Sequence, residues 1–252
     1  MENKFALNDQ AAVVTGGGTG IGKAIAACMV RAGARVLLTG RRRDVLERAC
    51  AEMGDRADYI VHDITRLDQA PAFAETVRRR IGVPNILVNN AGTHLKKSAA
   101  DTTEHDLQDI FNTAVLGAHA LTRAFLPDFI DRGSGSILFI TSMAAVFGIP
   151  SVSAYAAAKS SLLGLVRCYA TELSPQGIRV NAIAPGWIDT EMAQGALAHD
   201  PDRLQKIIAR TPMHRLGTPD EIGWAAVYLC SPAASFVTGQ QLIVDGGVSI
   251  GF

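Results

Sequence analysis

The sequence has few cysteines, no net charge and no long apolar run, and each absence excludes a class of protein. Its 4 cysteines are scattered over 252 residues without a C-x-x-C pair, so we expect reduced core thiols, with no disulfide and no metal site. Basic and acidic residues balance at 24 each, which leaves no charge excess for nucleic acid or an anionic membrane. No apolar run reaches the roughly 20 residues of a membrane-spanning helix, and no signal-peptide pattern opens the chain. These absences predict a globular cytoplasmic protein.

Short apolar segments alternate with longer amphipathic segments along the whole chain. Seven short segments have the composition of buried strands: Ala11–Thr15, Ala34–Thr39, Ala57–Val61, Ile86–Val88, Ser136–Thr141, Ile178–Ala184 and Gln241–Val244. Strands that alternate with helices form a parallel sheet with helices on both faces. We therefore predict one doubly wound α/β domain over residues 1–252, with about seven parallel strands. The stretch 188–212 is long enough to form a substrate lid.

A glycine-rich segment follows the first predicted strand and leads into a predicted helix. Residues 15–22 read TGGGTGIG, in which glycines allow the backbone to turn tightly and to approach a pyrophosphate at the helix N-terminus. The spacing differs from G-x-G-x-x-G, and the Lys-Ser/Thr of a P-loop is absent. Three glycines can also form a plain turn, but the strand–loop–helix context favours a dinucleotide site. We assign this site to Gly16, Gly18, Thr19, Gly20, Ile21 and Gly22.

The end of the second predicted strand indicates which dinucleotide would bind. NAD sites usually place a carboxylate there, roughly 20 residues after the glycines, but this chain has Gly40 followed by Arg41 and Arg42. A guanidinium suits a 2′-phosphate, so NADP(H) is favoured and NAD(H) is the alternative. The arginines could also be a solvated helix start, although cations there oppose the helix dipole. Asp63 is placed to accept a hydrogen bond from the adenine amine or to cap the next helix.

Five further patterns follow the glycine-rich segment in order. They are NNAG at Asn89–Gly92, Ser142, YAAAK at Tyr155–Lys159, PG at Pro185–Gly186 and VDGG at Val244–Gly247. Together with TGGGTGIG they resemble the short-chain dehydrogenase/reductase family over nearly the whole chain. Within that family the chain is most similar to gluconate 5-dehydrogenase-like and 3-oxoacyl-carrier-protein reductase-like members. The resemblance implies a Rossmann-type fold and an NAD(P)-dependent dehydrogenase or reductase that acts on CH–OH groups.

The YAAAK pattern supports acid–base chemistry. Tyr155 and Lys159 are four residues apart and share one helix face. A phenol titrates near ~10, and a nearby cation favours the phenolate, so Tyr155 can exchange a proton with a carbonyl or alcohol oxygen. Ser142 can hydrogen-bond that oxygen as charge develops on it. The resemblance implies that Asn112 holds a water in a proton relay to the lysine. Each residue alone would more often be structural, but the ordered set favours catalysis.

The resemblance also implies cofactor contacts at residues after the glycine-rich segment. These fall on Ile64, Asn90, Ala91, Gly92, Tyr155, Lys159, Pro185, Gly186, Ile188 and Thr190. His94 and the pair Lys96–Lys97 follow NNAG, so a cation there could pair with a substrate carboxylate, although exposed lysines are the commoner reading. Small residues around Tyr155, at Ala154 and Ala156–Ala158, indicate a packed helix face. That face fits a homotetramer, which the resemblance suggests, or burial within one subunit.

We expect hydride transfer between NADP(H) and a ketone or secondary alcohol, with a small polar substrate such as a sugar acid. A second enzyme hypothesis is 3-oxoacyl-carrier-protein reductase, which uses the same catalytic set on an acyl chain. A third hypothesis is a non-catalytic dinucleotide-binding sensor or scaffold, because a fold alone does not establish function. The intact set of Ser142, Tyr155 and Lys159 argues against the sensor.

Overall fold

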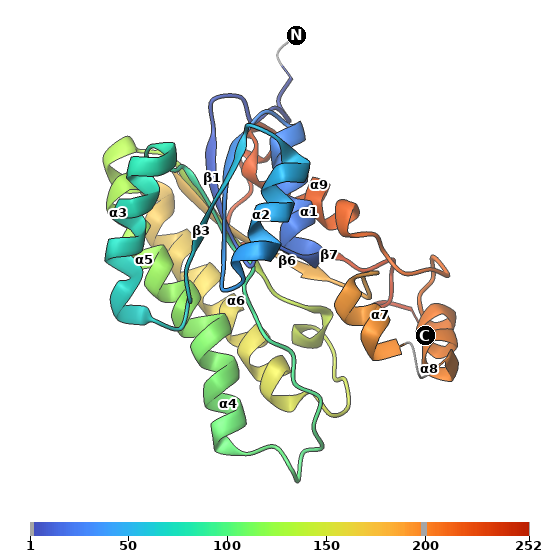
Figure 1. Cartoon of the computed structure of the whole chain (residues 1–252). Coiled ribbons are helices and arrows are strands. Elements are labelled where there is room, and N and C mark those ends of the chain that lie inside the picture. The colour runs from blue at the N-terminus through green and yellow to red at the C-terminus, as the bar shows by residue number, and fades with distance from the viewer. Residues whose placement is uncertain (1–2, 198–200, 252) are drawn as a thin grey trace.

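A seven-stranded parallel sheet forms the centre of the computed structural model, which describes residues 3–197 and 201–251 (Figure 1). The strand order is β3-β2-β1-β4-β5-β6-β7, with bounds β1 Ala11–Thr15, β2 Arg35–Gly40, β3 Ala57–Val61, β4 Ile86–Asn89, β5 Gly135–Ile140, β6 Ile178–Pro185 and β7 Gln241–Val244. All neighbouring strands pair in parallel. The predicted fold class is confirmed, and each predicted strand is observed with its ends shifted by at most one residue.

Helices cover both faces of the sheet. One layer contains α1 (Gly20–Arg31), α2 (Arg43–Met53) and α9 (Pro219–Cys230). The other layer contains α3 (Ala70–Ile81), α5 (Gly117–Arg132) and α6 (Ser153–Leu173), with α4 (Glu104–Phe111) packed against α6. The short helices α7 (Glu191–Leu197) and α8 (Pro201–Arg210) lie outside both layers, together at the right of Figure 1. They occupy the segment for which a lid is predicted.

Alternating side chains of the strands supply two separate cores. Val13 and Leu87 belong to the core beneath α3, α5 and α6, whereas Val14 and Val88 belong to the core beneath α1, α2 and α9. Successive side chains of a strand point to opposite faces, so a strand covered on both sides must be apolar at every position. For this reason the inner strands appear in the sequence as continuous apolar runs rather than as an alternating pattern.

The strand order places a switch point at the carboxyl ends of β1 and β4. After β1 the chain builds β2 and β3 on one side, and it then crosses over to build β4, β5, β6 and β7 on the other. The loops that leave β1 and β4 therefore diverge and leave a crevice between them, which is where open α/β sheets bind ligands. The glycine-rich segment and the NNAG pattern are these two loops.

The cysteines only partly match the expectation of reduced thiols in the core. The cysteines are free, but only Cys28 and Cys230 are buried; Cys50 is partly buried and Cys168 is exposed. The prediction of a core position is therefore wrong for Cys168, because this residue lies off the buried face of α6 that Leu162, Val166 and Ala170 form. In the described parts of the chain, no helix is both long and apolar enough to cross a bilayer.

Candidate active site

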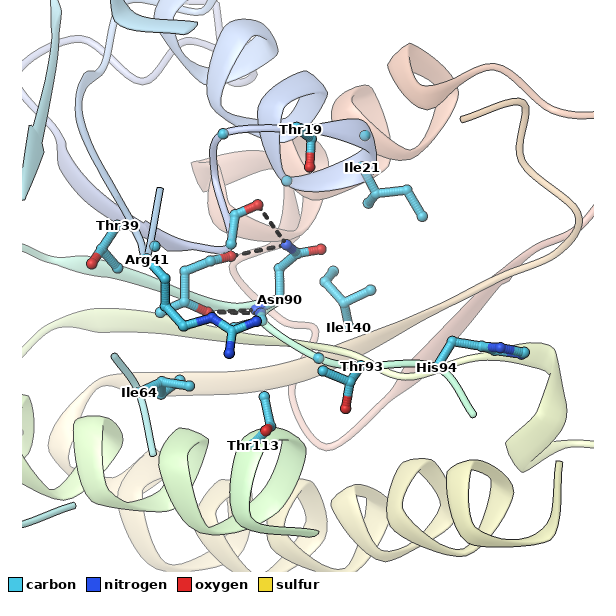
Figure 2. Close-up of a pocket in the computed structure, with 18 of the residues that line it drawn as sticks. Thr19, Ile21, Thr39, Arg41, Ile64, Asn90, Thr93, His94, Thr113 and Ile140 are labelled. Atoms are coloured by element: carbon cyan, nitrogen blue, oxygen red, sulfur yellow. Dashed lines mark hydrogen bonds between the residues drawn. The ribbon is translucent and has the colours of Figure 1, made fainter. Parts of the chain in front are cut away.

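A pocket of about 940 Å³ opens at the carboxyl ends of β1, β2, β4, β5 and β6 (Figure 2). Its volume is near the upper end of the range of about 300–1,000 Å³ that ligand sites have. The predicted site residues that line it are Gly16, Gly18, Thr19, Gly20, Ile21, Gly22, Arg41, Arg42, Asp63, Ile64, Asn90, Ala91, Gly92, Ser142, Tyr155, Lys159, Pro185, Gly186 and Thr190. Asn112 and Ile188 are the two predicted residues that do not line it.

The glycine-rich loop has the geometry of a phosphate cradle. Gly16 has a φ of 64°, and a Cβ at this position would lie 2.9 Å from the Asn90 side-chain nitrogen. A Cβ at Gly22 would collide with the carbonyl oxygen of Gly16. Within the described residues, Thr19 provides no side-chain cap for α1 and the first turn has no acidic residue. The free N–H groups of this helix end therefore suit an anionic group, and the pyrophosphate of a dinucleotide fits here.

Thr15 joins the glycine-rich loop to the loop after β4. Its hydroxyl accepts hydrogen bonds from the backbone N–H groups of Asn90 and Ala91, each at 2.9 Å, and donates to the carbonyl of Val88 at 3.2 Å. The Asn90 side chain donates in return to the Thr15 carbonyl at 2.9 Å (Figure 2). Thr15 is a site residue that was not predicted, although a polar residue at the end of a buried apolar strand was a usable signal.

One end of the pocket lies beside the carboxyl end of β2. Arg41 is exposed there, and its side chain extends from the strand end over the pocket in Figure 2. Burial alone would raise the pKa of the Asp63 carboxyl, but hydrogen bonds from Thr65 and the charge of Arg41 lower this pKa overall. One Asp63 oxygen accepts from the Thr65 backbone at 3.0 Å and from its hydroxyl at 2.8 Å. Asp63 therefore both caps a turn and lines the pocket.

The other end of the pocket brings together the predicted catalytic side chains. Ser142 follows β5, and Tyr155 and Lys159 lie on the first two turns of α6. The Tyr155 phenol lies close enough to the Ser142 side chain for that hydroxyl to influence its pKa. Lys159 is only 4% exposed, and its ammonium donates to the carbonyl of Ile140 at 2.7 Å. The same nitrogen lies 5.8 Å from the centre of the Tyr155 ring.

The protonation of this group differs from the expected acidified phenol. Burial raises the pKa of Tyr155 above its usual value, and the Ser142 hydroxyl opposes this only in part. Burial also lowers the pKa of Lys159 to about 8. The ammonium is directed to the Ile140 carbonyl rather than to the phenol oxygen, so desolvation decides the tyrosine pKa. The chain's own residues therefore keep the phenol protonated at neutral pH.

Two predicted site residues, Asn112 and Ile188, lie outside the pocket lining. Asn112 begins a π-helical turn, Asn112–Leu116, in which its carbonyl accepts from the backbone N–H of Gly117. The next residue, Thr113, lines the pocket instead. Ile188 is 7% exposed and packs in the core against Gly217. Helical periodicity could not reveal the π turn, which is a frequent feature of functional sites.

The basic residues after NNAG have different surroundings. Lys97 forms a 2.7 Å salt bridge with Asp106, a capping-box residue of α4. The hydrogen bond from Lys97, together with those from Thr103, lowers the pKa of Asp106 to about 2. Lys97 therefore anchors a helix and does not line the pocket, so the substrate contact considered for it is not supported here. His94 does line the pocket, and its ring centre lies 5.0 Å from that of Tyr155.

Comparison with known proteins identifies the family. A short-chain dehydrogenase/reductase model, described as "Enoyl-(Acyl carrier protein) reductase", matches residues 16–249. The chain belongs to the short-chain dehydrogenase/reductase family. It is therefore an oxidoreductase, and named relatives of this family are dehydrogenases that act on CH–OH groups.

Three similar proteins illustrate the range of this family. The 7alpha-hydroxysteroid dehydrogenase of Escherichia coli (strain K12) is 38% identical over 96% of this chain and 94% of its own length. The gluconate 5-dehydrogenase of Gluconobacter oxydans (strain 621H) is 34% identical over 98% of this chain and 97% of its own. A crystal structure of a gluconate 5-dehydrogenase from Burkholderia cenocepacia J2315, in complex with NADP and tartrate, has a TM-score of 0.93 at 32% identity, covering 99% and 98% of the two chains.

Proposed function

We propose that this protein transfers a hydride between NADP(H) and a ketone or secondary alcohol, with Tyr155 as the general acid and base. One observation carries the proposal: a single pocket has an arginine and no carboxylate at the end of β2, and Ser142, Tyr155 and Lys159 at its opposite end. A nicotinamide dinucleotide bound across the glycine-rich loop would connect these two ends.

The cofactor would be held by residues from each strand end around the pocket. The glycine-rich loop and the N-terminus of α1 would bind the pyrophosphate, and Arg41, with Arg42 beside it, would bind the 2′-phosphate in bidentate fashion. Asp63 would accept from the adenine amine with the oxygen that Thr65 does not use. The bound NADP of the Burkholderia relative supports this choice over NAD(H), which remains the alternative. When bound, the nicotinamide supplies or accepts the hydride.

The chain's own residues would move the proton. Tyr155, protonated at neutral pH, donates its phenolic hydrogen to the substrate carbonyl oxygen during reduction. Ser142 hydrogen-bonds the same oxygen and stabilises the charge that develops there. Lys159 is mostly protonated at pH 7, and its positive charge stabilises the phenolate that remains. The proton relay through Asn112 stays a prediction; Asn112 begins the π turn whose next residue, Thr113, lines the pocket.

The proposed substrate is a small hydroxylated acid. The gluconate 5-dehydrogenase relative and the tartrate in the Burkholderia complex support a carboxylate-bearing polyol or ketose. The second candidate is reduction of a 3-oxoacyl chain on a carrier protein, which the description of the matching family model favours. Both reactions would use the same Ser–Tyr–Lys chemistry, so the substrate has to be distinguished by assay.

A ketone panel with both cofactors tests the proposal. The purified protein is mixed with NADPH or NADH and with 5-keto-D-gluconate, L-sorbose or an acetoacetyl thioester, and absorbance at the reduced nicotinamide band is followed. We expect turnover with NADPH and highest kcat/KM for the ketogluconate. Preference for the thioester would favour the carrier-protein reaction, and no turnover with any carbonyl would overturn the proposal.

Three other expectations from the sequence stay predictions. They are the homotetramer, the cytoplasmic location and the single domain with a lid at residues 188–212. Within that segment the structure describes α7 and α8, while residues 198–200 lie outside the described chain. We propose that these two helices cover the substrate end of the pocket.

A further inference from the structure

His94 is a polar side chain at the catalytic end of the pocket that the proposed proton transfer does not use. It lines the pocket, and its ring centre lies 5.0 Å from that of Tyr155, with 54° between the ring planes. Figure 2 shows it on the opposite side of the pocket from Arg41. Among the described residues, the ring packs against Tyr155 and forms no hydrogen bond with the protein. Both ring nitrogens therefore have hydrogen-bonding capacity left for a ligand.

The loop that carries His94 is fixed at both ends. At its start, the Thr15 hydroxyl accepts from the two backbone N–H groups of Asn90–Ala91. At its end, the backbone N–H of Lys97 donates at 2.8 Å to the carbonyl of Ser151, in the segment between β5 and α6. The loop is thus held between the glycine-rich loop and the segment that leads to the catalytic tyrosine. The imidazole has a defined position, which a selective hydrogen bond to a ligand requires.

The imidazole is neutral at pH 7, and this decides which group it can bind. Burial lowers the pKa of His94, and the charges of Arg203 and Lys96 lower it further. A neutral imidazole has one N–H donor and one acceptor nitrogen. A hydroxyl group likewise donates and accepts, whereas a carboxylate only accepts and gains most from a cation. A substrate hydroxyl is therefore the better match.

The arginine and lysine residues that line the pocket do not supply a cation beside His94. In the described chain these are Arg41 and Arg42, at the end of β2, and Lys159. The Lys159 ammonium donates to the carbonyl of Ile140. A substrate group next to the reacting carbonyl would therefore meet a neutral ring that can donate and accept.

We infer that His94 hydrogen-bonds a hydroxyl on the carbon next to the reacting carbonyl, and thereby selects hydroxyketones over ketones without that hydroxyl. The inference rests on the proposed function and adds the substrate group that the site recognises. With the carbonyl oxygen at the Tyr155 hydroxyl, a neighbouring carbon would reach His94, because the two rings face one cavity side by side. A 3-oxoacyl chain has no hydroxyl on either carbon beside its ketone, so His94 favours the hydroxylated substrate.

The kinetic test separates the ring of His94 from its nitrogens. His94→Phe keeps a ring against Tyr155 but removes both nitrogens, whereas His94→Gln removes the ring and keeps a donor and an acceptor. The substrates are 5-keto-D-gluconate and 5-oxohexanoate, which has the same carbon chain, carboxylate and ketone but no hydroxyl.

For the ketogluconate, we expect His94→Phe to lower kcat/KM about five- to a hundredfold, the usual effect of leaving a hydrogen-bonding group unpaired. For 5-oxohexanoate, kcat/KM should change by less than about twofold. His94→Gln should keep most of the activity with the ketogluconate. Equal losses for the two ketones would overturn the inference. So would full activity of His94→Phe with a loss in His94→Gln, which would assign the ring to packing against Tyr155.

A binding measurement judges the inference without turnover. In a Tyr155→Phe background with saturating NADP⁺, isothermal titration calorimetry compares D-gluconate with hexanoate, which lacks the hydroxyls. Adding His94→Phe should weaken gluconate binding about five- to a hundredfold and leave hexanoate binding unchanged. The control His105→Gln, at an exposed histidine of α4, should change neither.

The two measurements separate failure of this inference from failure of the proposed function. If the wild type reduces no ketone but His94→Phe still weakens gluconate binding, the proposed function fails while the hydroxyl site stands. If the wild type reduces ketones but His94→Phe leaves gluconate binding unchanged, the inference fails while the proposed function stands.

Discussion

Thr15→Val should weaken both the fold and the cofactor site, because one hydroxyl fastens two loops. The side chain is 1% exposed, and its oxygen accepts from the N–H groups of Asn90 and Ala91 while donating to the Val88 carbonyl. Valine has the same shape and fills the space, but it leaves two backbone donors without this partner. An unsatisfied buried donor costs about 1–3 kcal/mol.

The net effect follows from these opposing contributions. Asn90 and Ala91 are only partly buried, so water can form hydrogen bonds with their N–H groups in the variant. We therefore take a cost of about 1–2 kcal/mol for each of the two donors. Burying a methyl group in place of the hydroxyl returns about 1 kcal/mol. The free energy of unfolding should therefore fall by about 1–3 kcal/mol, which lowers Tm by roughly 2–12 °C for a chain of this size.

Thermal and urea unfolding of Thr15→Val and Thr15→Ser would measure this loss. Serine keeps the hydroxyl and its three hydrogen bonds, so its main cost is the missing methyl group, and its affinity for NADPH should stay near that of the wild type. Thr15→Val should bind NADPH more weakly, because the end of β4 is no longer fixed against the glycine-rich loop. If valine were as stable as wild type and serine the weaker variant, packing rather than hydrogen bonding would explain the role of Thr15.

Three further predictions test the catalytic and cofactor assignments. Tyr155→Phe should lower kcat by about 10²–10⁴-fold with NADPH affinity unchanged, and a loss below tenfold would refute proton donation by Tyr155. Arg41→Ala should raise the Kd for NADPH about tenfold or more and leave that for NADH nearly unchanged; equal effects would exclude recognition of the phosphate. Lys159→Met should be most stable relative to wild type below pH 8 in urea titrations. Lys159 loses its proton near pH 8 in the folded protein and near ~10.4 in the unfolded chain. Between these pH values the unfolded chain binds more protons, so the free energy of unfolding of the wild type should rise with pH. A stability difference between Lys159→Met and wild type that does not change with pH would contradict the lowered pKa.

Features that depend on local sequence were predictable. Continuous apolar runs predicted the inner strands, because both sheet faces are covered, and the glycines predicted a tight loop after β1. The order of motifs then assigned most of the pocket lining, since parallel strands deliver their carboxyl ends to one edge of the sheet. These inferences needed only the pattern of each segment and the connection between neighbours.

Features that depend on distant contacts were not predictable in the same way. The sequence does not show that Lys97 pairs with Asp106, or that the Lys159 ammonium reaches the carbonyl of Ile140. The π turn at Asn112 is also hidden, because its extra residue interrupts the helical spacing from which side-chain faces are inferred.

The position of Lys159 links the stability of the chain to its chemistry. A buried ammonium is costly, and the carbonyl at the end of β5 offsets only part of that cost. The same burial keeps Tyr155 protonated, which is the state that a proton donor requires. Proton abstraction from an alcohol requires the phenolate instead, and the buried cation lies close enough to stabilise that charge once it forms. In the proposed mechanism, this desolvated pair would therefore serve both directions of the reaction, with the phenol as its resting form at neutral pH.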